Sequence, residues 1–369
     1  MEADSMAPFL LDTDDIAASQ SLSSLLNGSF IERLSNRAIA AAGNPTNALP
    51  AYMDPAMKLF ATMTNLAGYP YNISFQSDLQ KTIHQMSVHH DFACFQLAGS
   101  QLTASLPGKD AAQLTDPGWI PLNLCKGINA NLLQQAILAT SAFPLVLKPV
   151  LFKRPRKFIQ ENPWLNQQGL LLDSAADHVS LQVDGGLMNN EPFEKVRELL
   201  QEKAGGFASR SVSKDSFSSF TNTVLMIDPF PESTGFKETD SGTVTGVAKQ
   251  ILFAMMHQMK SKPLPIADMM NKEKAGQFLI APVRYQGSPK ERIEGARAIA
   301  SGSLQGFGGF LRKSFREHDY ALGQYNCLRF LQNHFTVPLK QFHQHPLFSK
   351  GYAEIDLQSF LCEKKESVQ

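Results

Sequence analysis

The chain contains 369 residues, which is enough to bury a hydrophobic core without disulfide or metal cross-links. Hydrophobic residues make up 43% and charged residues 18%, a composition that excludes disorder along the whole chain. The 34 Lys and Arg side chains balance the 34 Asp and Glu side chains, so the sequence lacks the basic excess of a duplex nucleic-acid binder.

The first third of the chain predicts one helix and two strands. The helix is expected after Asn27-Gly28, where Ser29 and Glu32 have the spacing of a capping box, and it is expected to end at Gly43. Residues 57–64 and 92–97 are short apolar runs and are predicted to be buried strands.

The middle and the end of the chain continue the alternation of helices and strands. Leu132, Leu133, Ala136 and Ile137 share one helical face, whereas Val179, Leu181 and Val183 alternate as in a strand that runs into Asp184. The remaining predicted elements are a helix from Pro192, a buried parallel strand at 224–227, a Met-rich helix at 247–259, a strand at 278–283 and a helical tail at 291–335.

This order of elements predicts an α/β layer fold with a largely parallel sheet. Residues 205–219 and 232–246 are rich in Ser, Thr, Gly and charge, and they are expected to be surface loops or disorder. The sequence contains neither a secretory signal nor about 20 uninterrupted apolar residues. The cysteines are far apart and form no CxxC pair, which fits a reducing, cytoplasmic location; they are Cys94, Cys125, Cys327 and Cys362.

The segment with the clearest chemical content is Val183-Asp184-Gly185-Gly186, followed by Asn190. A carboxylate at the end of a strand, followed by glycines, is where α/β folds place working side chains. Asp-Gly is also a common turn dipeptide, and taken alone the segment favours a simple turn.

A second segment, Ala139-Thr140-Ser141-Ala142-Phe143-Pro144, changes this balance. Together the two segments resemble the patatin-like acyl hydrolases, in particular a bacterial patatin-related subgroup. Membership would imply a three-layer α/β/α domain at 1–335 with a mostly parallel sheet and helical C-terminal additions, then an extension at 336–369. It would also imply hydrolysis of lipid carboxylic esters by a Ser–Asp dyad with Asp184 as the carboxylate, beside the motif residues Gly185, Gly186 and Asn190.

Two further blocks agree with the resemblance. Residues 60–66 look like the family strand that follows the nucleophile helix, and residues 315–327 look like a block of the bacterial subgroup. The residues of this last block suggest no chemical role.

The nucleophile of the family is missing from the sequence. A Ser–Asp dyad places its serine in G-x-S-x-G on a sharp turn, and neither this motif nor the preceding Gly-rich oxyanion loop occurs in the chain. A start placed late, a natural truncation or a non-catalytic homologue would each explain this, and the retained Asp184-Gly185-Gly186 favours the first two. Ser141 has no flanking glycine and is not expected to act as the nucleophile.

Several other residues suggest sites that their context disfavours. His89-His90 and the pair His343 and His345 lack the further ligands of a zinc site, and His318-Asp319 is expected to form a structural hydrogen bond. No metal or cofactor is therefore expected. A basic cluster suggests peripheral contact with anionic lipid headgroups: Lys153, Arg154, Arg156 and Lys157. The alternative function is a non-catalytic lipid-binding or interaction protein on the same fold, and a His-dependent metallohydrolase is the weakest hypothesis.

Overall fold

The computed structural model describes residues 5–14, 17, 24–43, 53–74, 83–98, 115–165, 169–188, 192–204, 224–229, 243–247, 250–251, 254, 277–287, 291–302, 306 and 308–333. Its contacts divide the chain into two compact units. The sheet unit consists of Pro8–Glu191 and Gly242–Lys260, and the second unit of Met1–Ala7, Pro192–Ser241 and Ser261–Gln369.

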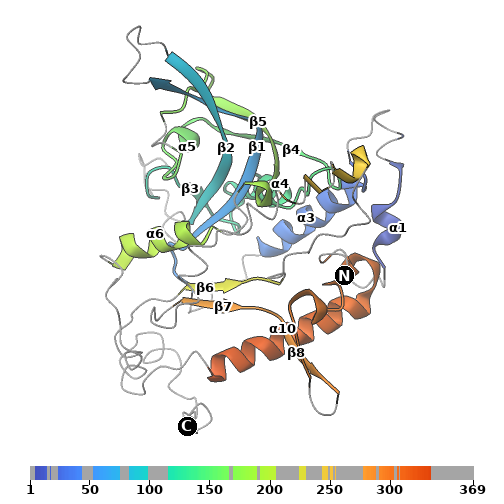
Figure 1. The fold of residues 1–369 in the computed structure, drawn as a ribbon. Helices are drawn as coiled ribbons and strands as arrows, with labels where there is room; N and C mark the ends of the chain where they lie inside the picture. Colours follow the sequence, from blue (N-terminus) through green and yellow to red (C-terminus); the bar gives the residue numbers. More distant parts are fainter. Residues whose placement is uncertain are drawn as a thin grey trace. The chain divides into compact units, whose positions relative to one another are not determined.

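The sheet unit is built on a five-stranded sheet of order β3-β2-β1-β5-β4 (Figure 1). The α/β class is confirmed, but a mostly parallel sheet is not confirmed in the described strands. Three of the four neighbouring pairs are antiparallel, and β2 with β3 is the parallel pair. The strands are β1 (Lys58–Ser74), β2 (Ile83–Leu97), β3 (Ile120–Leu122), β4 (Val150–Pro155) and β5 (Asp177–Asp184).

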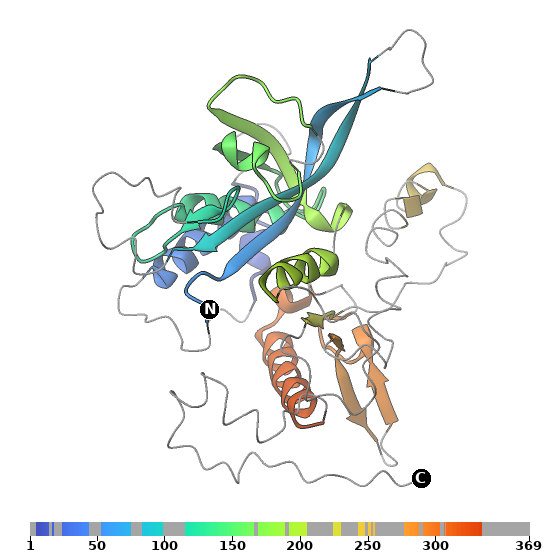
Figure 2. The same cartoon turned by 90° about the vertical axis from the view of Figure 1, so that its left-hand side faces the viewer.

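The first two strands are much longer than the sequence predicts. They pair antiparallel along most of their length, and both views show them as one twisted ribbon (Figures 1 and 2). The register shifts between Thr64 and Tyr69, and Gly68 lies within this bulge at a φ of 73°. Direct pairing of strands that follow each other in sequence gives an antiparallel sheet, because parallel neighbours need a crossover connection.

Two helices of the sheet unit are close to their predicted positions. Helix α3 (Gly28–Ala42) is capped by Asn27, whose side chain accepts a hydrogen bond from the Ser29 N–H at 2.9 Å, so the expected Ser29 cap is wrong by two residues. Gly43 ends this helix as predicted. In helix α4 (Ala130–Thr140), Ile137 is 41% exposed rather than buried, because Ala139 takes the inward position.

The apolar core lies between α4 and one face of the sheet. Helix α4 contacts β1, β4 and β5, and the short helix α5 (Lys157–Gln160) follows β4 directly. The core residues of this layer are Met63, Ala93, Phe95, Ile120, Leu122, Leu132, Leu133, Ala136, Ala139, Phe152 and Phe158.

A buried ionic network lies within the same sheet, which the sequence does not predict. Arg154 and Asp91 form an ion pair at 2.5 Å, with side chains that are 1% and 0% exposed. Arg154 also donates to the Phe92 carbonyl and to Tyr69 Oη, each at 2.8 Å. Asp91 Oδ2 accepts from Tyr69 Oη and from Gln182 Nε2, each at 2.6 Å.

This network corrects two expectations. Arg154 belongs to the interior, so the basic cluster of residues 153–157 does not present all four of its cations to solvent. In β5 the polar Ser180 and Gln182 are buried, whereas Val179 is 54% exposed. Gln182 points inward because Asp91 accepts its hydrogen bond, and burial of a hydrogen-bonded amide is tolerated.

The opposite face of the ribbon is covered by aromatic rings. Trp164 packs edge-to-face on Phe60 and Phe92, with ring centroids 4.7 and 4.9 Å apart, and Trp119 follows at 6.0 Å from Trp164. The sheet is therefore covered on both faces, by α4 on one and by the segments around Trp119 and Trp164 on the other.

The second unit combines short strands with a long helix. Helix α6 (Phe193–Ala204) starts where predicted and packs Phe193 on Val224. Strand β6 (Val224–Ile227) pairs in parallel with β7 (Gln277–Ile280), as predicted, although Ile227 is 73% exposed. The remaining elements are β8 (Val283–Gln286), β9 (Glu291–Glu294), the 3₁₀ turn η7 (Gly295–Arg297), α9 (Gly308–Leu311) and α10 (Lys313–Asn333).

Two predicted boundaries in this unit are wrong. The single strand expected at 278–283 is divided between β7 and β8, and the expected helical tail begins with strand β9. Pro282 stands between β7 and β8, and it has no N–H with which to continue a ladder.

Several predictions fall outside the described residues. They concern Asn190, residues 205–219, residues 232–242, most of the Met-rich segment at 247–259, His343, His345 and residues 336–369. The domain boundary expected at residue 335 therefore stays a prediction. Within the residues that can be described, no helix is both long enough and apolar enough to cross a membrane.

Candidate functional site

Asp184 is the last residue of β5 and caps the 3₁₀ turn η4 (Gly185–Leu187) that follows. Its Oδ1 accepts a hydrogen bond from the Gly186 N–H at 2.8 Å. A strand that ends in a carboxylate and passes at once into a turn is the local structure that the Asp184-Gly185-Gly186 sequence predicts, and the structure confirms it.

Three sequence blocks that lie far apart in the chain meet at Asp184. The Asp184 N–H donates to the Ala142 carbonyl at 3.0 Å, which joins it to the Ala139–Pro144 block. From the 60–66 block, Met63 pairs with Asp184 across the strands, and Thr64 Oγ1 donates to the Asp184 carbonyl at 2.9 Å. Three of the four blocks on which the resemblance rests thus form one local structure.

Gly185 has no room for a side chain. A Cβ at this position would lie 2.4 Å from the backbone of Thr62. Gly185 does not have a positive φ, so its backbone conformation alone does not require glycine. The glycine after Asp184 is therefore required by the close approach of β1, and this packing fixes where the carboxylate stands.

The environment of Asp184 suits a base. Burial raises the pKa of Asp184 above its ordinary value, and the hydrogen bond from the Gly186 N–H opposes this only in part. A carboxylate with a raised pKa is a better proton acceptor than an ordinary one, and such shifts are concentrated at functional sites. Asp184 is only partly exposed, so the carboxylate also remains within reach of solvent.

Ser141 is close in the fold but has another partner. It forms the C-terminal cap of α4, and its Oγ donates to the Ile137 carbonyl at 2.7 Å. Ser141 Oγ makes no hydrogen bond to Asp184 in the described part of the chain, and the expectation that Ser141 is not the nucleophile stays a prediction.

A serine–aspartate hydrogen bond does occur in the second unit. Ser301 Oγ donates to Asp319 Oδ2 at 2.5 Å, and Asp319 also accepts from the N–H groups of Ala300 and Ser301 and from His318. Burial is the largest single effect and raises the pKa of Asp319, but these hydrogen bonds outweigh it and hold that pKa below its ordinary value. A carboxylate saturated with donors is a weak base, so this cluster supports the turn around residue 300.

The 315–327 block has a structural role that the sequence does not suggest. Arg316 donates to the Gly309 carbonyl at 2.6 Å, and Asn326 accepts from the Val283 N–H at 3.2 Å. With Asp319 these residues follow one face of α10, at the spacing of successive turns. The block therefore ties α10 to the loops and strand beside it.

The histidine pair of β2 is accounted for within the fold. His89 Nδ1 lies 2.8 Å from the Asn65 carbonyl oxygen, and His90 packs edge-to-face on Phe92. The described ranges contain no group of three or more His, Cys, Asp or Glu side chains that could hold a metal ion.

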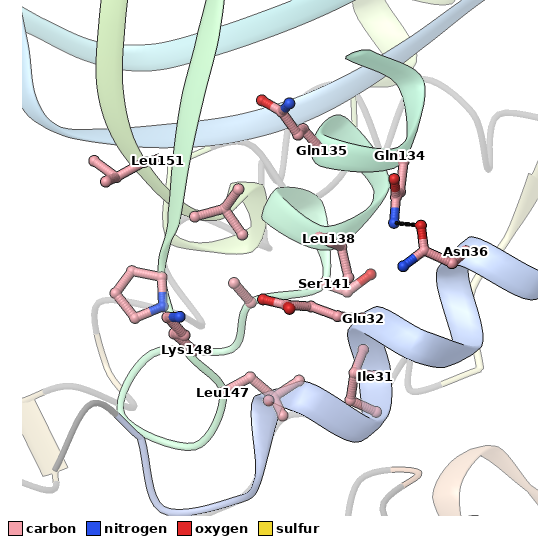
Figure 3. Close-up of a pocket in the computed structure, with 14 residues that line it drawn as sticks. Ile31, Glu32, Asn36, Gln134, Gln135, Leu138, Ser141, Leu147, Lys148 and Leu151 are labelled. Atoms are coloured by element: carbon pink, nitrogen blue, oxygen red, sulfur yellow. Dashed lines mark hydrogen bonds between the residues drawn. The ribbon is translucent and has the colours of Figure 1, made fainter. Parts of the chain in front are cut away.

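A cavity of about 390 Å³ lies beside the Ala139–Pro144 block (Figure 3). Its walls come from α3, from the C-terminal half of α4 and from the segment that leads into β4. The lining residues are Gly28, Ile31, Glu32, Asn36, Gln134, Gln135, Leu138, Ser141, Ala142, Leu147, Lys148, Pro149, Val150 and Leu151.

The chain is 31% identical, over an alignment of 382 residues, to the uncharacterized protein y4iI of Sinorhizobium fredii. That alignment covers 94% of this chain and 51% of the relative, so the chain spans about half the length of the curated protein it matches. No protein-family model and no solved structure matches the chain.

Proposed function

We propose that this chain carries the carboxylate of a patatin-like Ser–Asp acyl hydrolase that cleaves carboxylic esters of lipids. Asp184 is the general base in this proposal, and the domain is of the three-layer patatin type. The observation that supports it best is the position of Asp184 at the end of β5, with a raised pKa and a single N–H donor, where three separated blocks converge.

The proposed step is the transfer of a proton from a serine hydroxyl to Asp184. The serine oxygen attacks the ester carbonyl, an acyl-serine forms, and the alcohol leaves with a proton; water then hydrolyses the acyl-serine. No G-x-S-x-G occurs in the chain, so the proposal takes the serine from a nucleophile segment outside this sequence.

Hydrolysis of a short p-nitrophenyl ester tests the role of Asp184. In the chain extended by its nucleophile segment, loss of a general base should lower the rate by about 10²–10⁴-fold in Asp184→Asn. Asp177→Asn is the matched control, because Asp177 begins the same strand and is exposed. Hydrolysis that is unchanged in Asp184→Asn would show that Asp184 is not the base.

The nucleotide sequence upstream of Met1 tests the source of the serine. An in-frame Gly-rich loop followed by G-x-S-x-G would supply the nucleophile segment, and the ester assay would then use the chain extended by it. Failure of that extended chain to hydrolyse the ester would refute the proposal.

The alternative is a non-catalytic lipid-binding or interaction protein on the same fold. The observation in its favour is that the sequence contains no G-x-S-x-G. A fluorophosphonate probe distinguishes the two functions, because covalent labelling of a serine in the active protein would eliminate the non-catalytic one.

A further inference from the structure

The cavity beside α4 carries two opposite charges on separate walls. Glu32 comes from α3, and Lys148 comes from the segment between α4 and β4. Figure 3 shows the Glu32 side chain reaching from α3 into the cavity, toward the side on which Lys148 lies. The two side chains form no ion pair within 4 Å among the described residues, and both residues are exposed to solvent.

The rest of the lining is mixed: Asn36, Gln134, Gln135 and Ser141 are polar, and six larger side chains are apolar. Gln134 of α4 donates to Ser35 Oγ at 2.9 Å and to Asn36 Oδ1 at 2.8 Å, and these bonds tie α4 to α3 (Figure 3). Gly28 lets Lys148 approach the start of α3, because a Cβ at Gly28 would lie 3.2 Å from the Lys148 Cβ. The apolar side chains of the lining are Ile31, Leu138, Leu147, Pro149, Val150 and Leu151.

We propose that this cavity binds a zwitterionic head group, with an ammonium group at Glu32 and a phosphate or carboxylate at Lys148. A ligand of one sign would be attracted by one wall and repelled by the other, whereas a zwitterion satisfies both. An attached alkyl chain would lie along the apolar side chains of the lining, as in most small-molecule sites, where a few polar groups orient a largely apolar ligand.

The site needs no chemistry from Asp184. Ala142 lines the cavity and its carbonyl accepts the Asp184 N–H, so the two sites share the Ala139–Pro144 block. Binding can nevertheless be measured in the absence of hydrolysis. A negative binding result would therefore leave the proposed role of Asp184 unaffected, and absence of esterase activity would leave the binding site unaffected.

The experiment measures binding of four probes to the full chain by isothermal titration calorimetry. Hexylphosphocholine is the zwitterion, hexyl sulfate the anion and hexyltrimethylammonium the cation, and phosphocholine lacks the chain. Hexylphosphocholine should bind about five-fold more tightly than either single-charge probe, the ratio expected from one extra solvent-accessible ion pair. Weaker binding of phosphocholine would indicate a lipid head group, and equal binding would indicate a small free zwitterion.

Two variants make the test independent of folding defects. Glu32→Gln should weaken the binding of hexylphosphocholine and strengthen the binding of hexyl sulfate, each by about five-fold. Lys148→Gln should weaken the binding of hexylphosphocholine and strengthen the binding of hexyltrimethylammonium by the same factor. Glu161→Gln and Lys126→Gln change charges that do not line the cavity, and they should leave all affinities unchanged. Equal binding of the three hexyl probes would overturn the proposal. So would a Glu32→Gln variant that does not bind hexyl sulfate more tightly, or a Lys148→Gln variant that does not bind hexyltrimethylammonium more tightly.

Discussion

Removal of Arg154 from the buried network should destabilise the sheet unit severely. Arg154→Met takes away the ion pair with Asp91 and the bonds to the Phe92 carbonyl and to Tyr69, all within an interior where both charged side chains are almost fully buried. Burial by itself would lower the pKa of Arg154, but its charge interactions and hydrogen bonds with Asp91 and Tyr69 outweigh burial and raise the pKa above its ordinary value. An uncompensated Asp91 would remain, and breaking a buried pair costs about 3–5 kcal/mol.

The neighbouring residue of the same strand supplies the control. Lys153 pairs with Asp177 at 3.2 Å, but its side chain is 62% exposed. Lys153→Met should therefore change the free energy of unfolding by less than about 1 kcal/mol. The two substitutions remove one cation each from β4 and differ in burial.

Urea unfolding followed by tryptophan fluorescence measures both effects. The chain has two tryptophans, Trp119 and Trp164, both of which pack in the sheet unit, so the signal reports on that unit. A double-mutant cycle with Asp91→Asn should show that the pair of substitutions costs about 2–3 kcal/mol less than the sum of the single costs. A loss in Arg154→Met no larger than in Lys153→Met, or strict additivity in the cycle, would refute this account of the network.

Four further substitutions test the packing and the two carboxylates. Gly185→Ala should lower the urea midpoint because its Cβ meets β1 backbone at 2.4 Å, whereas Gly323→Ala has nothing within 4 Å and should raise stability by about 0.5–1 kcal/mol. The raised pKa of Asp184 means that the folded state holds its proton longer than the unfolded state, so wild-type stability falls as pH rises through that pKa. Asp184→Asn should therefore melt higher than wild type at neutral pH, and the difference should vanish in acid. The effect of pH at Asp319 is the opposite. Because the pKa of Asp319 is lowered in the folded state, its carboxylate stabilises the fold at pH values above the ordinary pKa of 3.8, and this stability is lost as the pH falls through the lowered pKa. Asp319→Asn should cost about 1–2 kcal/mol at neutral pH through its bonds to Ser301, measured by circular dichroism melting.

The local features of the site follow from the sequence. Asp184 is placed correctly at the end of a strand, and the turn after it is predicted, because a strand pattern followed by Asp-Gly is a short-range signal. The meeting of the Ala139–Pro144 block with Asp184 could not have been predicted from periodicity alone.

The inward face of β5 could not be predicted in the same way. Gln182 looks like an outward residue until its partner Asp91 is known, and the two are 91 positions apart in the sequence. The burial of Arg154 could not be predicted either, because its basic neighbours suggest an exposed position and its partner Asp91 lies 63 positions away in the sequence. Long-range polar pairs override the local pattern because a buried polar group that is hydrogen-bonded no longer has the free-energy penalty of burial that its hydropathy implies.

The division into two units has a practical consequence for dissecting the molecule. The chain passes from one unit to the other at Ala7/Pro8, Glu191/Pro192, Ser241/Gly242 and Lys260/Ser261, so each unit is assembled from separate stretches of sequence. A fragment that ends at Glu191 keeps Asp184 and the cavity but loses residues 242–260 of its own unit. No single cut yields either unit whole, and binding or esterase measurements are best made on the intact polypeptide.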